Sequence, residues 1–164
     1  MRDEQIHSPV AVLVDAVAGD LTGVGPHVGR QVGVGGPDAR VEDGPHVGVE
    51  RLLGHRFSAL RVRYWHDGEK SAWILDEIGK ELPITIGVAV ENGSIRNVRV
   101  LEFRESRGWE VRYPFFTDQF VDARLGPDEK LDRRIDGITG ATLSVGAVTR
   151  IARVALVLHE HVSG

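Results

Sequence analysis

Short runs in which apolar and polar residues alternate begin after residue 57. The run ALRVRYW (59–65) alternates with a period of two, which predicts a half-buried strand, and HDG (66–68) predicts the turn that follows it. The run SAWILDEIG (71–79) fits a strand or a short helix, because its pattern does not separate the two periods. At least one strand is therefore expected at the start of this region.

The next two runs predict a β-hairpin. ITIGVAV (84–90) and SIRNVRVLEF (94–103) are rich in residues that favour strands, and they flank the turn sequence ENG (91–93). Asn92-Gly93 suits the positive φ angles of a tight hairpin turn. The two runs are therefore expected to pair as antiparallel strands.

Helical spacing replaces alternation towards the end of the chain. RESRGWEVRYP (104–114) predicts a charged loop or short strand, FFTDQF (115–120) a helical turn with an aromatic face, and ARLGPDEKLDRRI (123–135) a polar connection. From about Ser144 to Glu160, apolar residues recur along one face of a predicted helix. They are Val145, Val148, Ile151, Ala152, Ala155 and Leu158. Strands followed by a closing amphipathic helix predict an α+β domain with a mostly antiparallel sheet.

Composition divides the chain near residue 55. No Phe, Trp or Tyr precedes Phe57, whereas ten of the 20 glycines and four of the seven prolines lie before residue 56. A segment with so little large apolar surface does not easily offset the entropy lost on ordering. We therefore expect residues 1–55 to be a poorly ordered or peripheral extension, or the result of a wrongly assigned start, and residues 56–164 to form the domain.

Charge and composition exclude several classes of protein. The net charge of −4 and a pI near 6.0 argue against a nucleic-acid partner, since such proteins usually carry a basic face. The absence of cysteine excludes disulfides, thiolate metal sites, iron–sulfur clusters and cysteine nucleophiles. No run approaches the roughly 18 apolar residues of a membrane span. Asp3, Glu4 and Asp15 interrupt the faint likeness of the N-terminus to a signal peptide.

The stretch DGITGATLSVGAV (136–148) places glycines and three hydroxyl side chains at the start of the predicted helix. The first turn of a helix has unpaired N–H groups and a positive dipole end, which suit a phosphate group. Gly140 and Ala141 would let a phosphate approach the backbone closely. Thr142 and Ser144 can cap the helix, bind an anion or carry one covalently, and the residues alone leave these alternatives open.

This stretch resembles the flavinylation motif of the FMN-binding domain family. Members include the flavin-carrying subunits of the sodium-pumping NADH:quinone reductase and of the Rnf electron-transport complex. The family motif is Asp-Gly-x-Ser/Thr-Gly-Ala-Thr, and its fixed positions are met by Asp136, Gly137, Thr139, Gly140, Ala141 and Thr142. In the family, a flavin transferase splits FAD and joins FMN through its phosphate to the last threonine. The resemblance implies that Thr142 carries FMN, with Leu143 and Ser144 beside it.

A second, weaker resemblance lies upstream, where ESRGWE (105–110) takes the place of the family's Glu-Thr-Pro-Gly-Leu-Gly. The positions that match in kind are Glu105, Ser106 and Gly108, and those that depart are Arg107, Trp109 and Glu110. Trp109 either stacks on the flavin ring or belongs to the core. Arg104 or Arg107 either favours the anionic reduced flavin or is simply solvated. The resemblance covers roughly residues 84–160.

The family implies an electron-transfer flavoprotein domain with covalent FMN and no catalytic or metal-binding residue of its own. An alternative is a redox-sensing or interaction module of a membrane-associated regulatory or respiratory complex, and a third is a structural domain without flavin. The implied partners are a flavin transferase and redox donor and acceptor proteins, some of them membrane-bound, and no nucleic acid. The resemblance also implies an extracytoplasmic location.

Two other groups of ionisable residues have simpler interpretations. Asp76 and Glu77 are neighbours, so they should point to different faces of a strand or helix and not work as a pair. His159 and His161 lie near the end of the predicted helix, where a histidine usually complements the helix dipole.

Overall fold

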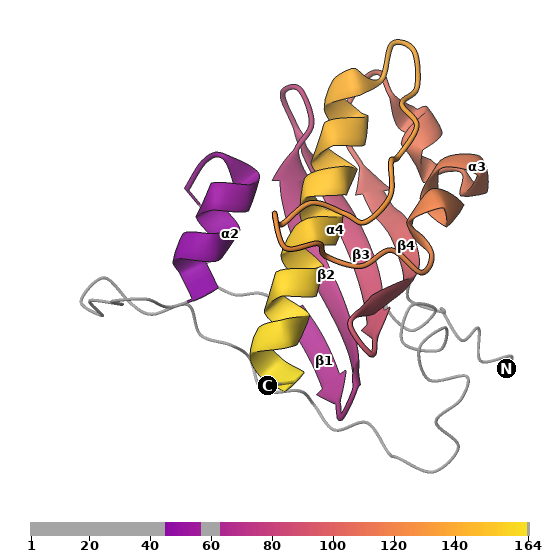
Figure 1. Ribbon diagram of the computed structural model, residues 1–164. Helices are drawn as coiled ribbons and strands as arrows, with labels where there is room; N and C mark the ends of the chain where they lie inside the picture. The colour runs from indigo at the N-terminus through magenta and orange to yellow at the C-terminus, as the bar shows by residue number, and fades with distance from the viewer. Residues whose placement is uncertain (1–44, 57–62, 164) are drawn as a thin grey trace, which may run out of the picture.

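The computed structural model describes residues 45–56 and 63–163 (Figure 1). Within these ranges one antiparallel sheet has the strand order β1-β2-β3-β4. The strands are β1 (Arg63–Asp67), β2 (Lys70–Ile78), β3 (Pro83–Glu91) and β4 (Ser94–Phe103). The long helix α4 (Thr142–Ser163) lies along one face of the sheet, with the shorter helix α2 (Pro45–Leu53) beside it (Figure 1). The predicted α+β architecture is confirmed.

The run at 71–79 forms most of strand β2 and not a helix, because β2 pairs with a strand on each of its two sides. Trp73 pairs with Tyr64 of β1 and with Val88 of β3, so β2 is an inner strand of the sheet. Trp73 is 1% exposed and stacks on Tyr64 with their ring centroids 4.8 Å apart. The strand predicted at 59–65 is tested only from Arg63 onward, because residues 57–62 lie outside the described ranges.

The predicted hairpin is confirmed as β3 and β4. Asn92 and Gly93 have φ angles of 52° and 71°, which gives the left-handed turn that the Asn-Gly pair favours. Along β3, Ile84, Ile86 and Val88 are fully buried on the face that α4 covers. The hairpin therefore supplies a large part of the hydrophobic core.

Helix α4 is the central helix of this core. Of the apolar face predicted from sequence, Val148, Ile151, Ala152 and Ala155 are buried, while Val145 and Leu158 are partly buried against the same cluster. By length and composition α4 would suffice to cross a membrane, but half of its apolar window is buried inside the domain. Its apolar surface is thus explained by packing on the sheet.

Helix α2 packs against α4 from the side opposite to α3 (Figure 1). Val49, Leu52 and Leu53 are each 5% exposed or less and belong to the same hydrophobic cluster. Arg51 forms an ion pair with Glu129 in the connection before α4. Helix α2 belongs to residues 1–55, which the composition predicts to be an extension of the domain. Residues 1–44 lie outside the described ranges. The domain boundary near residue 55 therefore stays a prediction.

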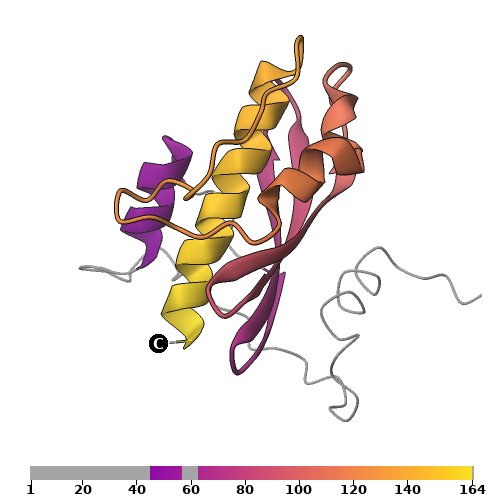
Figure 2. The same cartoon turned by 45° about the vertical axis from the view of Figure 1, so that its right-hand side comes forward.

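The segment after β4 covers the outer edge of that strand. It contains the short helices η1 (Trp109–Arg112), α3 (Pro114–Thr117) and η2 (Asp118–Phe120). Phe116 and Phe120 are fully buried and meet edge to face at 5.4 Å, which confirms the predicted aromatic helical turn. The polar connection that follows crosses the outer side of α4 (Figures 1 and 2), where Arg153 Nε donates to the Glu129 carbonyl at 2.6 Å.

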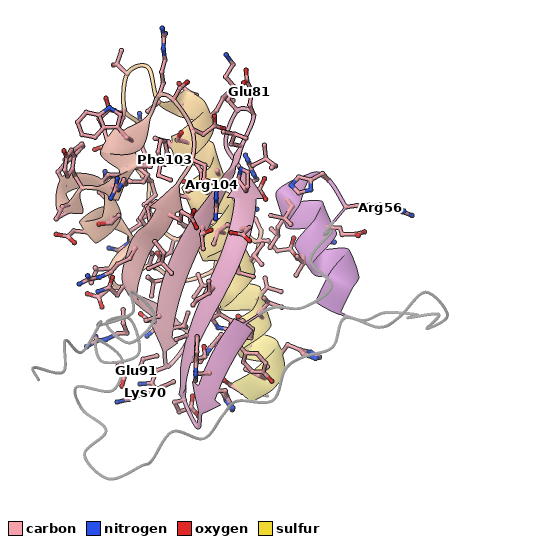
Figure 3. The ribbon with its side chains drawn as sticks, turned by 180° about the vertical axis from the view of Figure 1, so that it is seen from behind. Arg56, Lys70, Glu81, Glu91, Phe103 and Arg104 are labelled. Carbon is pink, nitrogen blue, oxygen red and sulfur yellow. The ribbon has the colours of Figure 1, made fainter. Side chains whose placement is uncertain are left out.

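The opposite face of the sheet is covered by no helix of the described chain (Figure 3). Arg104 lies across this face, donates to the Pro83 carbonyl at 3.0 Å and pairs with Glu102. Thr85 accepts from Arg104 at 3.1 Å and donates to Asp76 Oδ1 at 2.5 Å. These bonds place Arg104 on the sheet and not beside the helix that follows the motif.

Candidate functional site

The first residue of α4 is Thr142, and its side chain is exposed. The carbonyl of Ala141 accepts the first helical hydrogen bond, from Val145 N at 2.9 Å. Ala141 therefore occupies the N-cap position, and neither Thr142 nor Ser144 does. The Thr142 hydroxyl makes no hydrogen bond within the described ranges, so it is free to react or to bind a ligand.

The turn before Thr142 leaves open space around the backbone. Ala141 N donates to the Ile138 carbonyl at 3.0 Å, and Gly140 has a φ of 83°, a value that favours glycine. A Cβ added at Gly137 or Gly140 would meet no atom within 4 Å. The glycines thus keep room beside the start of α4 that a phosphate can occupy.

Gln119 holds the start of the motif in place. Its Oε1 accepts from Asp136 N at 2.7 Å, and its Nε2 donates to the Asp136 carbonyl at 3.5 Å. The carboxylate of Asp136 lies 3.8 Å from Arg134 Nε and is exposed to solvent. The contact from Gln119 was not predicted from the sequence, because it joins two segments without any local pattern.

The segment 105–109 lies directly against the start of α4. Gly108 has a φ of 86°, and a Cβ added there would lie 2.6 Å from Ser144 Oγ and 3.4 Å from Ala141 Cβ. Ser144 is 4% exposed, so its hydroxyl faces this loop and not a bound phosphate at the surface. The two motifs that resemble the family are therefore brought together, and only glycine fits at their contact.

Glu105 connects the same loop to the β2–β3 turn. Its Oε1 accepts the backbone N–H groups of Lys80 at 2.5 Å, Glu81 at 2.7 Å and Leu82 at 2.9 Å. The N–H groups of Leu82 and Glu81, followed by that of Lys80, lower the pKa of Glu105, so the carboxylate stays charged at neutral pH. Glu105 thus organises the backbone around the site, while the neighbouring Ser106 is exposed.

Trp109 lies at the surface of this end of the molecule and not in the core. It is 48% exposed and meets Tyr113 edge to face at 5.3 Å, and Tyr113 lies 6.2 Å from Phe115. The large hydrophobic side chains that are exposed in the described ranges come from the β2–β3 turn, this loop and the start of α4. They are Ile78, Leu82, Trp109, Tyr113, Phe115 and Leu143. Roles for Tyr113, Phe115 and Leu82 were not predicted from the sequence, although the run WEVRYPFF is a signal for an aromatic surface.

The three segments that meet at this end lie within a match to a known family. Residues 79–157 match the model of a family described as the FMN-binding domain. The chain contains an FMN-binding domain over these residues. A search of the curated proteins finds no match to the chain. The FMN-binding domain starts at the turn held by Glu105 and includes both the loop at Gly108 and the start of α4.

The residues at this end fit FMN chemically. The free Thr142 hydroxyl, the unpaired N–H groups of the first helical turn and the space at Gly137 and Gly140 suit a phosphate. The exposed aromatic side chains suit a planar apolar ring. In addition, Oε2 of Glu110, the residue after Trp109, is buried without a hydrogen-bond partner among the described residues. An orphaned acceptor of this kind can be satisfied by the N–H or hydroxyl groups of a bound cofactor.

A buried carboxylate lies between α2, β2 and α4. The side chain of Glu77 is 1% exposed and points to the helix face, whereas Asp76 points to the open face, as predicted. His55 Nε2 lies 2.9 Å from Glu77 Oε1, and Arg150 Nη2 donates to the same oxygen at 3.2 Å. His55 Nδ1 lies 2.8 Å from the Arg56 carbonyl. Because both ring nitrogens face acceptors, only the protonated imidazolium satisfies both bonds, and the Arg56 carbonyl and then Glu77 raise the pKa of His55.

The interpretation of His159 as a partner of the helix dipole is wrong. His159 is 2% exposed, its Nδ1 lies 2.7 Å from Ser71 Oγ, and its Nε2 accepts from Gly93 N at 3.3 Å. Burial, helped by the nearby His66, lowers the pKa of His159, so the ring is neutral in the folded protein. Ser71 also accepts from Trp73 Nε1 at 2.8 Å, which ties the end of α4 to the sheet. No group of three or more His, Cys, Asp or Glu side chains is placed to bind a metal ion in residues 45–56 and 63–163.

Proposed function

We propose that this protein is an electron-transfer flavoprotein domain in which FMN is attached through its phosphate to Thr142. The observation that carries the proposal is the free, exposed hydroxyl of Thr142 at the first residue of α4, inside a motif that matches the family's attachment sequence. The helix dipole and the unpaired N–H groups of the first turn favour the negative charge of a phosphodiester at this position.

Attachment would proceed by transfer of FMN from FAD, with a flavin transferase as the maturation partner. The Thr142 oxygen forms a bond to the phosphorus of the FMN half, the pyrophosphate bond of FAD breaks, and AMP leaves. The hydroxyl proton passes to the transferase or to water. The role of this chain is to present the threonine on a rigid helix start, which the contact between Gly108 and Ser144 supports.

FMN supplies reversible one- and two-electron chemistry, and the chain supplies the surroundings of the ring. Trp109, Tyr113 and Leu82 offer exposed apolar surface, and Arg107 is an exposed cation two residues before Trp109. A covalent tether suits a carrier that works outside the cytoplasm, where a lost cofactor is not replaced. We therefore infer extracytoplasmic redox donor and acceptor proteins, membrane-bound ones among them, as partners.

The test is co-expression with a flavin transferase, followed by intact mass and in-gel flavin fluorescence. We expect the wild-type chain to gain the mass of one FMN and to fluoresce, and Thr142→Ala to do neither. Thr149→Ala is the matched control, because Thr149 is a threonine of the same helix outside the motif, and this variant should still gain one FMN. Modification of Thr142→Ala would move the attachment site elsewhere, and an unmodified wild-type chain would reject covalent attachment.

A redox titration of the flavinylated protein tests the second half of the proposal. For an electron carrier, we expect the bound flavin to be reduced by a low-potential donor and reoxidised by an added acceptor without any small-molecule substrate. A flavin that is reduced but cannot pass electrons to any protein or quinone acceptor would instead favour the redox-sensing alternative.

A further inference from the structure

A cavity lies away from Thr142, at the outer edge of β4. It has a volume of about 290 Å³ and is bounded on one side by β4 and on the other by η1, α3 and η2. Its lining residues are Asn97, Val98, Arg99, Val100, Arg112, Pro114, Thr117 and Asp118. Ligand pockets commonly measure about 300–1,000 Å³, so this one is of a size for a small metabolite and not for a flavin with its side chain.

The three charged side chains around this cavity are all unpaired. Arg99, Arg112 and Asp118 make no side-chain hydrogen bond or ion pair within the part of the chain that the structure describes. Other arginines on the same strand and its extension are paired, since Arg96 bonds Glu91 at 3.1 Å and Arg104 bonds Glu102. Arg99, Arg112 and Asp118 are therefore three exposed residues that line the same cavity without bonding one another.

Unpaired groups of opposite sign around one small cavity suit a ligand that itself carries both charges. We propose that this cavity binds a small zwitterion of the amino-acid class. Arg99 and Arg112 would bind its carboxylate, Asp118 would bind its ammonium group, and Val100 and Pro114 would contact its side chain. The Asn97 amide and the Thr117 hydroxyl provide further hydrogen-bonding groups at the wall.

The site is separate from the flavin anchor, although the two share a loop. Arg112 and Pro114 line the cavity, while Tyr113 between them contacts Trp109 on the other side. Binding of the zwitterion needs no flavin, so it can be tested on the protein without cofactor, and the result does not depend on the proposed attachment at Thr142.

The experiment is a titration of the full-length, ¹⁵N-labelled protein with each of the twenty amino acids, followed by NMR. For at least one amino acid we expect saturable shifts of the amide signals of residues 97–100 and 112–118, with a Kd of about 0.1–10 mM. The N-acetyl derivative of that amino acid lacks the ammonium group and its amide lacks the carboxylate, so each should bind about tenfold more weakly. The absence of saturable shifts with all twenty amino acids, or derivatives that bind as tightly as the amino acid itself, would overturn the proposal.

Variants assign the charges to their roles. Arg112→Gln and Asp118→Asn should each weaken binding of the amino acid by about tenfold, and Asp118→Asn should remove the preference over the N-acetyl derivative. Arg96→Gln is the matched control, because it removes an arginine from the same strand but outside the cavity, and it should bind as wild type. Equal weakening in all three variants would show an effect that is not specific to the cavity and reject the site.

Discussion

Gly108 is the residue at which the two motifs of the site meet. Glycine is favoured here for two separate reasons. The backbone has a φ of 86°, which other residues rarely adopt, and a Cβ added at this position would lie only 2.6 Å from Ser144 Oγ. Rotation of Ser144 alone would not remove the clash, since Ser144 Cβ would still lie 3.2 Å away. Any larger residue must therefore push the loop 105–109 away from α4.

We predict that Gly108→Ala lowers the free energy of unfolding by about 1–3 kcal/mol, from backbone strain together with overpacking. The measurement is urea unfolding of the protein without flavin. Gly140→Ala is the control, because its φ of 83° is almost the same but no atom lies within 4 Å of an added Cβ. Gly140→Ala should lower the free energy of unfolding by only about 1 kcal/mol, from backbone strain alone. Equal losses in the two variants would contradict close packing of Gly108 on Ser144.

At the scale of elements, the buried Glu77 joins three parts of the fold. His55 follows α2, Glu77 is on β2 and Arg150 is on α4, and all three side chains meet at one carboxylate. Both His55 Nε2 and Arg150 Nη2 bond Oε1 of Glu77, so each cation offsets the cost of burying this carboxylate. The attachment of α2 to the domain should therefore depend on the charge of His55.

We predict that His55→Gln destabilises the protein more at low pH than at high pH. The folded pKa of His55 is raised, so its stabilising contribution is fully present below the unfolded pKa of about 6.5 and is lost as the pH rises through the folded pKa. The difference in Tm between wild type and variant should accordingly be largest near pH 6 and shrink towards pH 9. A difference that stays constant across this range would show that His55 acts through packing and not through its charge.

Across the whole molecule, two histidines with opposite titration behaviour hold α4 and its neighbours. His55 lies towards the Thr142 end of the helix through Arg150, while His159 lies in the last turns and bonds Ser71. His159 is neutral when folded because burial lowers its pKa, so the unfolded chain takes up the proton first on acidification. On acidification, His55 therefore adds stability as the pH falls through its raised pKa towards about 6.5, whereas His159 removes stability as the pH falls below about 6.5.

We predict that His159→Gln reduces the loss of stability on acidification. In the wild type, the contribution of His159 should fall as the pH drops below the unfolded pKa of about 6.5, and in the variant this loss should be absent. The measurement is the slope of the unfolding free energy with pH between 7 and 5, which is compared with that of His55→Gln. His55→Gln should show a steeper slope than His159→Gln. It keeps the loss of stability that protonation of His159 causes, but it lacks the stability that protonation of His55 adds. The reverse order would contradict these assignments.

Local patterns in the sequence determined the hairpin, the closing helix and the motif at residues 136–142. The strand-favouring residues in 84–90 and 94–103 reflect two paired strands, and the recurrence at Val148, Ile151, Ala152 and Ala155 reflects a helix with one buried face. Each of these features depends on residues within one or two turns of each other. The Asn92-Gly93 turn and the motif ending at Thr142 are local in the same sense.

Only the tertiary structure decided which distant groups meet. It brought Gly108 onto Ser144 and Glu105 onto the turn at Lys80. It buried His159, which the sequence suggested as a partner of the helix dipole. It also left Trp109 exposed, although its residue type is compatible with a core. The physical reason is that such contacts depend on how a whole helix packs on a whole sheet, and no short-range periodicity records that packing.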